Sequence, residues 1–210
     1  RGFYRGEYHS DLCVDGRAEE IFGPKYRRYI EFIRPHLPVG STTLDVGCAT
    51  GLLPKMLQNL GYRAEGIELN PATAQWGRDH YGIPIHQGTI EALCDERKKF
   101  DLVSMTDVLE HTVQPAAELL AIRGILKQEG YLLVTFPDIQ SFSSRYLGFL
   151  SRLLRRDWLW CTCHIPLHTW EFTYPTAKRL FEENGFALVA FQRSQAFSFA
   201  PSLAGIVSFP

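Results

Sequence analysis

The chain has 210 residues and a formal net charge of −1, with 22 basic against 23 acidic residues. This length predicts a single domain, residues 1–210, whose core is large enough to cover both faces of a sheet. The near-zero charge argues against nucleic acid or an anionic membrane as a partner. Five scattered cysteines argue against a disulfide framework, and no apolar run reaches the roughly 18 residues of a membrane span. We therefore expect a cytoplasmic protein with a small-molecule partner and no signal peptide.

From residue 42 onward, apolar runs alternate with amphipathic stretches, as in a mainly parallel sheet with helices on both faces. The predicted strands are Thr42–Val46, Tyr62–Glu68, Ile83–Gln87, Phe100–Met105, Gly130–Phe136 and Phe186–Arg193. The predicted helices are Gly23–Leu37, Leu52–Leu60, Pro71–His80, Pro115–Lys127 and Pro175–Asn184. We expect an α/β fold of the Rossmann-like type, a three-layer sandwich around a mainly parallel sheet of seven strands.

The segment Leu44–Gly51 reads LDVGCATG, an apolar strand that ends in a turn of small residues directly before a helix. Glycines allow the close backbone approach and the unusual dihedral angles of a tight ligand-binding turn. A dinucleotide-binding turn has the pattern G-x-G-x-x-G/A. Here the small residues stand at positions 47, 49 and 51, and Leu52 follows. Asp45 stands two positions before the first glycine, where a carboxylate can order the turn and interact with a cationic amino-acid group.

This turn resembles motif I of the class I S-adenosylmethionine-dependent methyltransferases, D-x-G-x-G-x-G, with Ala49 in place of the middle glycine. Glu68 ends the second predicted strand, where a carboxylate can accept hydrogen bonds from both hydroxyls of a ribose. Gln87–Glu91 resembles the adenine segment of the family, with Thr89 in place of the usual aspartate. Phe100–His111 resembles motif IV of the ubiquinone-biosynthesis O-methyltransferases. The resemblance covers residues 40–192.

The resemblance implies S-adenosylmethionine as the cofactor. The residues implied to contact it are Asp45, Gly47, Cys48, Ala49, Gly51, Glu68, Leu69, Thr89, Ile90 and Thr106. Tyr8 and Arg28 precede the turn. An N-terminal tyrosine and arginine often close over the methionine carboxylate in such enzymes, and aromatic packing in the core is the alternative for this region.

Asp107, Glu110 and His111 follow the fourth predicted strand, and a helical turn there would bring them to one face. Together with His168 they resemble the divalent-metal site of small-RNA 2′-O-methyltransferases, with Asp107 in place of a glutamate. A set with two histidines favours zinc or a transition metal over magnesium. Three interpretations stay open: a metal held by all four residues, His111 or His168 as a general base, and purely structural roles.

We predict a methyltransferase that acts on an oxygen of a small molecule. The alternatives are N-methylation of an amine or amino sugar, a nicotinamide-dependent oxidoreductase, and a cofactor-binding scaffold without activity. Within the domain, we expect a helical cover at residues 1–40, a cofactor-binding core at 41–140 and a C-terminal helix with strands at 169–210. Ser141–His168 is rich in aromatic and arginine residues, which favours either a substrate cap or a packing helix with a solvated basic face.

Overall fold

The structure is a computed structural model that describes residues 17–94, 98–138, 140, 153–154, 169–193 and 202–209. Within these ranges, seven strands form one sheet in the order β3-β2-β1-β4-β5-β7-β6. The strands are β1 Thr42–Val46, β2 Arg63–Glu68, β3 Ile85–Gln87, β4 Phe100–Thr106, β5 Leu126–Pro137, β6 Ala187–Arg193 and β7 Ser202–Ser208. The pairs from β3 to β5 are parallel, and β7 pairs antiparallel with both β5 and β6.

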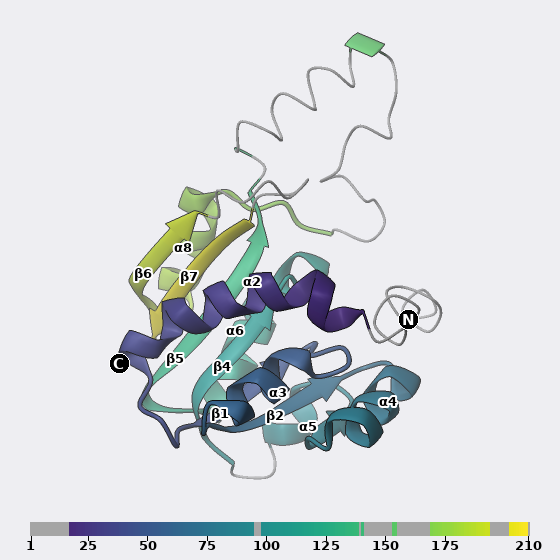
Figure 1. The fold of residues 1–210 in the computed structure, drawn as a ribbon. Coiled ribbons are helices and arrows are strands. Elements are labelled where there is room, and N and C mark those ends of the chain that lie inside the picture. Colours follow the sequence, from purple (N-terminus) through teal and green to yellow (C-terminus); the bar gives the residue numbers. More distant parts are fainter. Residues whose placement is uncertain are drawn as a thin grey trace.

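Helices cover both faces of this sheet (Figure 1). They are α2 Ala18–Ile33, α3 Leu52–Asn59, α4 Pro71–Tyr81, α5 Glu91–Cys94, α6 Pro115–Ile125 and α8 Tyr174–Glu183, with the 3-10 turns η2 Arg34–His36 and η3 Leu109–His111. In β4, Leu102 packs with α2 and α3, and its neighbour Val103 packs with α6 and α8. Successive side chains of a strand point to opposite faces. The predicted α/β sandwich with a mainly parallel, seven-stranded sheet is therefore confirmed.

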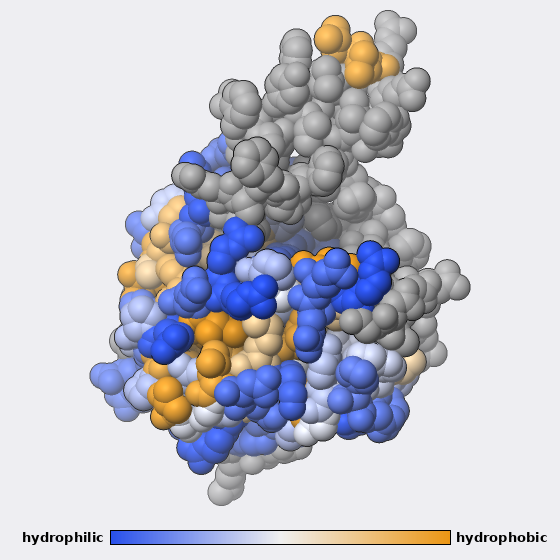
Figure 2. All heavy atoms as spheres, viewed as in Figure 1, coloured by the Kyte–Doolittle hydropathy of each residue, from blue (hydrophilic) through white to orange (hydrophobic). Residues whose placement is uncertain are grey.

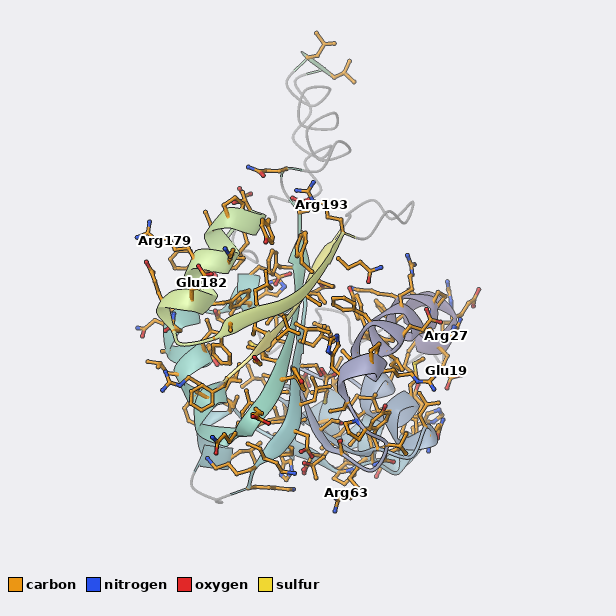
Figure 3. The ribbon with its side chains drawn as sticks, turned by 90° about the vertical axis from the view of Figure 1, so that its left-hand side faces the viewer. Glu19, Arg27, Arg63, Arg179, Glu182 and Arg193 are labelled. Atoms are coloured by element: carbon orange, nitrogen blue, oxygen red, sulfur yellow. The ribbon has the colours of Figure 1, made fainter. Side chains whose placement is uncertain are left out.

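Helix α2 lies across the face of the sheet that α3 also covers (Figure 1). It buries Tyr29, Ile30 and Ile33 against the sheet, while Glu19 and Arg27 point outward (Figure 3). Its outward surface is accordingly hydrophilic (Figure 2). The helix begins at Ala18, five residues before the predicted start, and contains Pro24. Its buried stripe, rather than local propensity, therefore explains why this helix continues through a proline.

The junction between α6 and β5 differs from the prediction. The helix ends at Ile125 and β5 begins at once, so Gly130 lies inside the strand rather than at its start. The ladder with β4 is irregular here: Leu126 pairs with Phe100, but Tyr131 pairs with Leu102. A Cβ atom on Gly130 would lie 2.8 Å from the carbonyl oxygen of Lys127, so this glycine serves a close backbone approach.

The sheet reverses its strand order between β1 and β4, since β2 and β3 follow on one side of β1 and β5 on the other side of β4. In open α/β sheets, ligands bind outside the carboxyl ends of the strands at such a point. The predicted cofactor turn follows β1 there, and Asp107 follows β4. No helix in the described part of the chain is both long and apolar enough to cross a membrane.

Candidate cofactor and catalytic site

The turn after β1 has three residues in left-handed conformation, with φ of +68° at Gly47, +48° at Ala49 and +82° at Gly51. The amides of Gly47 and Cys48 both donate to the carbonyl oxygen of Ile67, at 2.9 and 3.1 Å, and so tie the turn to β2. Alanine in this conformation costs roughly 1–2 kcal/mol, and glycine costs little. The turn therefore keeps the backbone of the glycine-rich motif although Ala49 replaces its middle glycine.

Three neighbouring elements approach this turn too closely for an added side chain. A Cβ atom on Gly47 would lie 2.6 Å from Cγ2 of Val108. On Gly66 of β2 it would lie 2.3 Å from Sγ of Cys48, and on Gly77 of α4 it would lie 2.3 Å from the carbonyl oxygen of Thr50. The buried, free thiol of Cys48 therefore packs the turn against β2.

Glu68 ends β2 with its carboxylate held by two backbone amides. Oε2 accepts a hydrogen bond from Ala49 at 2.9 Å, and Oε1 accepts one from Asn70 at 2.8 Å. The Asn70 side chain in turn caps α4 by accepting from Ala72 and Thr73. A carboxylate can accept about four hydrogen bonds, so each oxygen keeps capacity for a ligand hydroxyl. This arrangement suits two adjacent hydroxyls, as on a ribose.

Asp45 lies beneath the turn and is 2% exposed. The Ser104 hydroxyl of β4 donates to its Oδ1 at 2.6 Å. Burial, with a smaller contribution from the charge of Glu68, raises the pKa of Asp45 to about 7, although the Ser104 hydrogen bond favours the ionised form. The turn therefore encloses a carboxyl group that a cationic ligand would drive to its charged form.

The residues predicted on the adenine side have different surroundings. Leu69 is half exposed beside Glu68. Thr89 is exposed, and its hydrogen bond to Glu91 lowers the pKa of that carboxyl. The side chain of Ile90 is 2% exposed and packs in the core cluster. A ring beside this segment would therefore meet Leu69 and the backbone of residue 90.

Asp107 follows β4 in left-handed conformation, with φ of +56°. Its amide donates to the carbonyl oxygen of Thr135 at 3.0 Å, and the Thr135 hydroxyl donates to its Oδ1 at 2.9 Å. Its other oxygen, Oδ2, accepts a hydrogen bond from the ammonium of Lys25 on α2. Both carboxylate oxygens are therefore engaged by groups of this chain.

Glu110 lies in the 3-10 turn η3 and is 2% exposed. Neither of its carboxyl oxygens has a hydrogen-bond partner among the described residues. Burial and the nearby charge of Asp107 raise its pKa to about 8, so the neutral form is favoured. Its backbone oxygen accepts hydrogen bonds from the amides of Thr169 and Trp170, at 2.9 and 3.1 Å. The turn thereby fixes the chain where it returns at residue 169.

The predicted metal site does not fit the described residues. These residues include no group of three or more Cys, His, Asp or Glu side chains that could hold a metal ion. Asp107 is bound by Lys25 and Thr135, while His111 lies half buried in η3. His168, which was predicted as a fourth ligand or a base, lies outside the described residues, as does Tyr8.

Lys25 is a residue of this site that is not among the residues predicted from the sequence. Arg28, predicted on the same helix, is exposed, and its Nε donates to the carbonyl oxygen of Pro24. Lys25 lies four and eight residues before Tyr29 and Ile33, both buried, so it shares the inward stripe of the helix. That spacing is the signal that could have identified it.

A family model described as a methyltransferase domain matches residues 18–190. A ubiquinone biosynthesis O-methyltransferase of Xanthomonas axonopodis pv. citri is 30% identical over 146 residues, 63% of this chain and 61% of that protein. One from Nitrosococcus oceani is 33% identical over 125 residues, 56% of this chain and 52% of that protein. The matched part thus spans less than two thirds of either relative.

Solved structures share the fold of this chain. A SAM-dependent methyltransferase from Archaeoglobus fulgidus has a TM-score of 0.70 at 17% identity, over 96% of this chain and 100% of that chain. A magnesium protoporphyrin IX methyltransferase from Synechocystis PCC 6803, solved with bound SAH, has a TM-score of 0.66 at 14% identity, over 98% and 90% of the two chains. Because the family model covers most of its length, this chain belongs to the methyltransferase-domain family.

Proposed function

We propose that the chain transfers the methyl group of S-adenosylmethionine to an oxygen of a small molecule. The observation that carries the proposal is the position of the Glu68 carboxylate. Two backbone amides hold it beside the turn after β1, and each of its oxygens can still accept a hydrogen bond from a ribose hydroxyl. The two relatives described above are ubiquinone biosynthesis O-methyltransferases, which favours oxygen as the acceptor atom. The near-zero net charge favours a small molecule over nucleic acid.

In this proposal Asp45 attracts the cationic amino acid of the cofactor, and the backbone of Gly47–Gly51 lies against it. The ribose binds Glu68, and the adenine lies beside Leu69 and the segment at Thr89. Thr106, at the end of β4, is proposed beside the methionine part, and the resemblance alone assigns Tyr8 and Arg28 to close the site. Each of the other roles follows from the motif resemblance together with the position of the strand ends.

Methyl transfer from a sulfonium is an in-line displacement. The acceptor oxygen attacks the methyl carbon, the carbon–sulfur bond breaks, S-adenosylhomocysteine leaves, and the hydroxyl proton passes to a base. Because the methyl group is already activated, the protein mainly orients the acceptor and excludes water. His111 or His168 is proposed as the base. A divalent ion is not part of this proposal, since the Lys25 ammonium already donates a hydrogen bond to the Asp107 carboxylate.

The test combines calorimetry with an acceptor screen. We expect S-adenosylmethionine and S-adenosylhomocysteine to bind and NADH not to bind. Release of S-adenosylhomocysteine should then follow addition of phenols or alcohols. Turnover with amines alone would favour N-methylation, and binding without turnover on any acceptor would favour a scaffold. Binding of NADH without binding of either sulfur compound would overturn the proposal.

We also propose that Ser141–His168 caps the acceptor. All of this segment except residues 153–154 lies outside the described residues. The proposal rests on its aromatic and arginine content and on its position after β5, at the carboxyl edge of the sheet. In the same assay, Trp158→Ala with Trp160→Ala should raise the acceptor KM and leave cofactor affinity within a few fold. A collapse of cofactor affinity in a folded variant would instead assign the segment to the cofactor.

Asp45 should couple cofactor binding to proton release. With a pKa of about 7, about half of the free protein carries this proton at pH 7. A bound cation favours the carboxylate, so affinity should rise from pH 6 to pH 8. Calorimetry in buffers of different ionisation enthalpy should show release of about half a proton at pH 7. Asp45→Asn should abolish the release, and an unchanged release in that variant would contradict the role.

The same shift affects the stability of the free protein. Because the pKa of Asp45 is raised on folding, the folded state holds a proton that the unfolded state has lost between about pH 4 and pH 7. Its contribution to the free energy of unfolding is therefore largest below pH 4 and declines as pH rises to 7.

We further propose a cytoplasmic location from the composition, to be checked by cell fractionation.

A further inference from the structure

Asp107 and Glu110 form an acidic cluster at the carboxyl end of β4. In the sequence these residues resemble ligands of a divalent ion. In the fold, Lys25, which stands 82 positions before Asp107 in the chain, reaches this cluster. The Lys25 ammonium donates to Oδ2 of Asp107, and both side chains are about one third exposed.

Helix α2 holds Lys25 in this position from behind. Its Nζ lies 5.8 Å from the centroid of the Tyr29 ring, one turn further along the helix, where a cation and an aromatic face attract each other. Tyr29 is itself 5% exposed and packs with Ile30 and Ile33 against the sheet. The ammonium is therefore presented by a buried part of the helix, and its position is set by the core.

The charges around Lys25 favour its ionised form. Burial alone would lower the pKa of Lys25, but the charge of Asp107 and its hydrogen bond, with a contribution from Tyr29, raise it above its ordinary value. The cluster therefore contains a permanent cation of its own at neutral pH.

We infer that the Lys25 ammonium is the resident cation of the Asp107–Glu110 cluster and takes the place that a divalent ion has in the metal-site interpretation of the same sequence. Lys25 is then a positioning residue: it holds Asp107 beside the switch point and neutralises the cluster. This role of Lys25 deepens the proposed function. It rests on that function in one respect, which is that the methyl donor binds near the Asp107–Glu110 cluster.

The coordination chemistry supports this exchange. A metal ligand must offer a free lone pair in a suitable direction, but the two oxygens of Asp107 are taken by Lys25 and the Thr135 hydroxyl. Glu110 is 2% exposed, and neither of its carboxyl oxygens has a partner among the described residues. A divalent ion would have to displace the ammonium first, against the repulsion between two cations.

The test uses Mn²⁺ as the probe, because carboxylate and imidazole ligands suit this ion and its unbound form is measured directly by electron paramagnetic resonance. The full chain should show no saturable binding of Mn²⁺ up to about 1 mM. Lys25→Met removes the ammonium and should tighten Mn²⁺ binding by about tenfold or more. Lys25→Arg keeps the cation and should behave as the wild type. Lys25→Gln repeats the test with a polar side chain, should the methionine variant fold poorly.

Lys178→Met is the matched control, since Lys178 forms an exposed ion pair with Glu182 on α8, away from the cluster. It should not gain Mn²⁺ binding. Asp107→Asn combined with Lys25→Met should lose the gained site. Saturable binding of Mn²⁺ to the wild type would overturn the inference. So would a failure of both Lys25→Met and Lys25→Gln to gain Mn²⁺ binding. The proposed function predicts that the wild type binds S-adenosylhomocysteine. Calorimetry with this ligand on the same samples therefore separates failure of the proposed function from failure of the inference.

Discussion

Replacing Glu68 by alanine should weaken binding of S-adenosylmethionine and S-adenosylhomocysteine by about a hundredfold or more. The variant removes two charge-assisted hydrogen bonds to the proposed ribose, each worth roughly 1.5–3 kcal/mol, and a hundredfold corresponds to about 2.7 kcal/mol. It also leaves the Ala49 amide without its acceptor, so the turn loses an anchor. Calorimetry measures the affinity directly.

Glu68→Gln is the graded control, because it keeps the shape and one carbonyl acceptor and should lose less affinity than the alanine variant. An affinity unchanged in both variants would exclude Glu68 from the site. A substitution at Gly47 is a poorer test, since an added Cβ would collide with Val108 at a φ of +68°. The lost affinity would then report a disturbed turn rather than a lost contact.

Replacing Gly77 by alanine should destabilise the protein by roughly 1–3 kcal/mol, the usual cost of overpacking. Helix propensity alone predicts the opposite, since alanine is about 1 kcal/mol better than glycine inside a helix. The new Cβ would lie 2.3 Å from the carbonyl oxygen of Thr50, a backbone atom that cannot rotate away. Helix α4 must therefore move from the turn, and affinity for S-adenosylhomocysteine should fall with stability.

Gly23→Ala in α2 makes the matched comparison. A Cβ there would lie 3.4 Å from the Arg27 guanidinium, which can move, so stability should stay the same or rise by up to about 1 kcal/mol. Thermal unfolding of the two variants measures the difference. Equal stability of Gly77→Ala and the wild type would mean that α4 does not press on the turn.

The central strands and the cofactor turn could be predicted because their signals are local. Strand β1 begins and ends at the predicted residues, Thr42 and Val46, and the turn after it carries its own glycines. Glu68 was found in the same way, at the end of an apolar strand. The resemblance added the cofactor, since the spacing of the small residues argues against the dinucleotide pattern but does not choose a ligand.

Other parts of the fold depend on contacts between distant residues. The strand β7, Ser202–Ser208, was not named in the sequence, and it enters the sheet between β5 and β6. The junction at Gly130 depends on an irregular ladder with β4. The spacing of Lys25 from the buried residues of α2 shows only that it faces inward; its contact with Asp107 depends on how α2 crosses the sheet. The metal site predicted from Asp107, Glu110, His111 and His168 does not take this cation into account.

The tether at Glu110 has a consequence for how this fold diversifies. The chain leaves β5 at Pro137 and is held again at Thr169, whose amide and hydroxyl both donate to the Glu110 backbone oxygen. The entropic cost of joining two fixed points by a longer loop rises by only about 0.6 kcal/mol for each doubling of loop length. Segments of different length and composition can therefore be exchanged between these two attachment points while Asp45, Glu68 and the turn keep their geometry. Under the proposed function, chimeras joined at these points should differ in acceptor range and still bind S-adenosylhomocysteine.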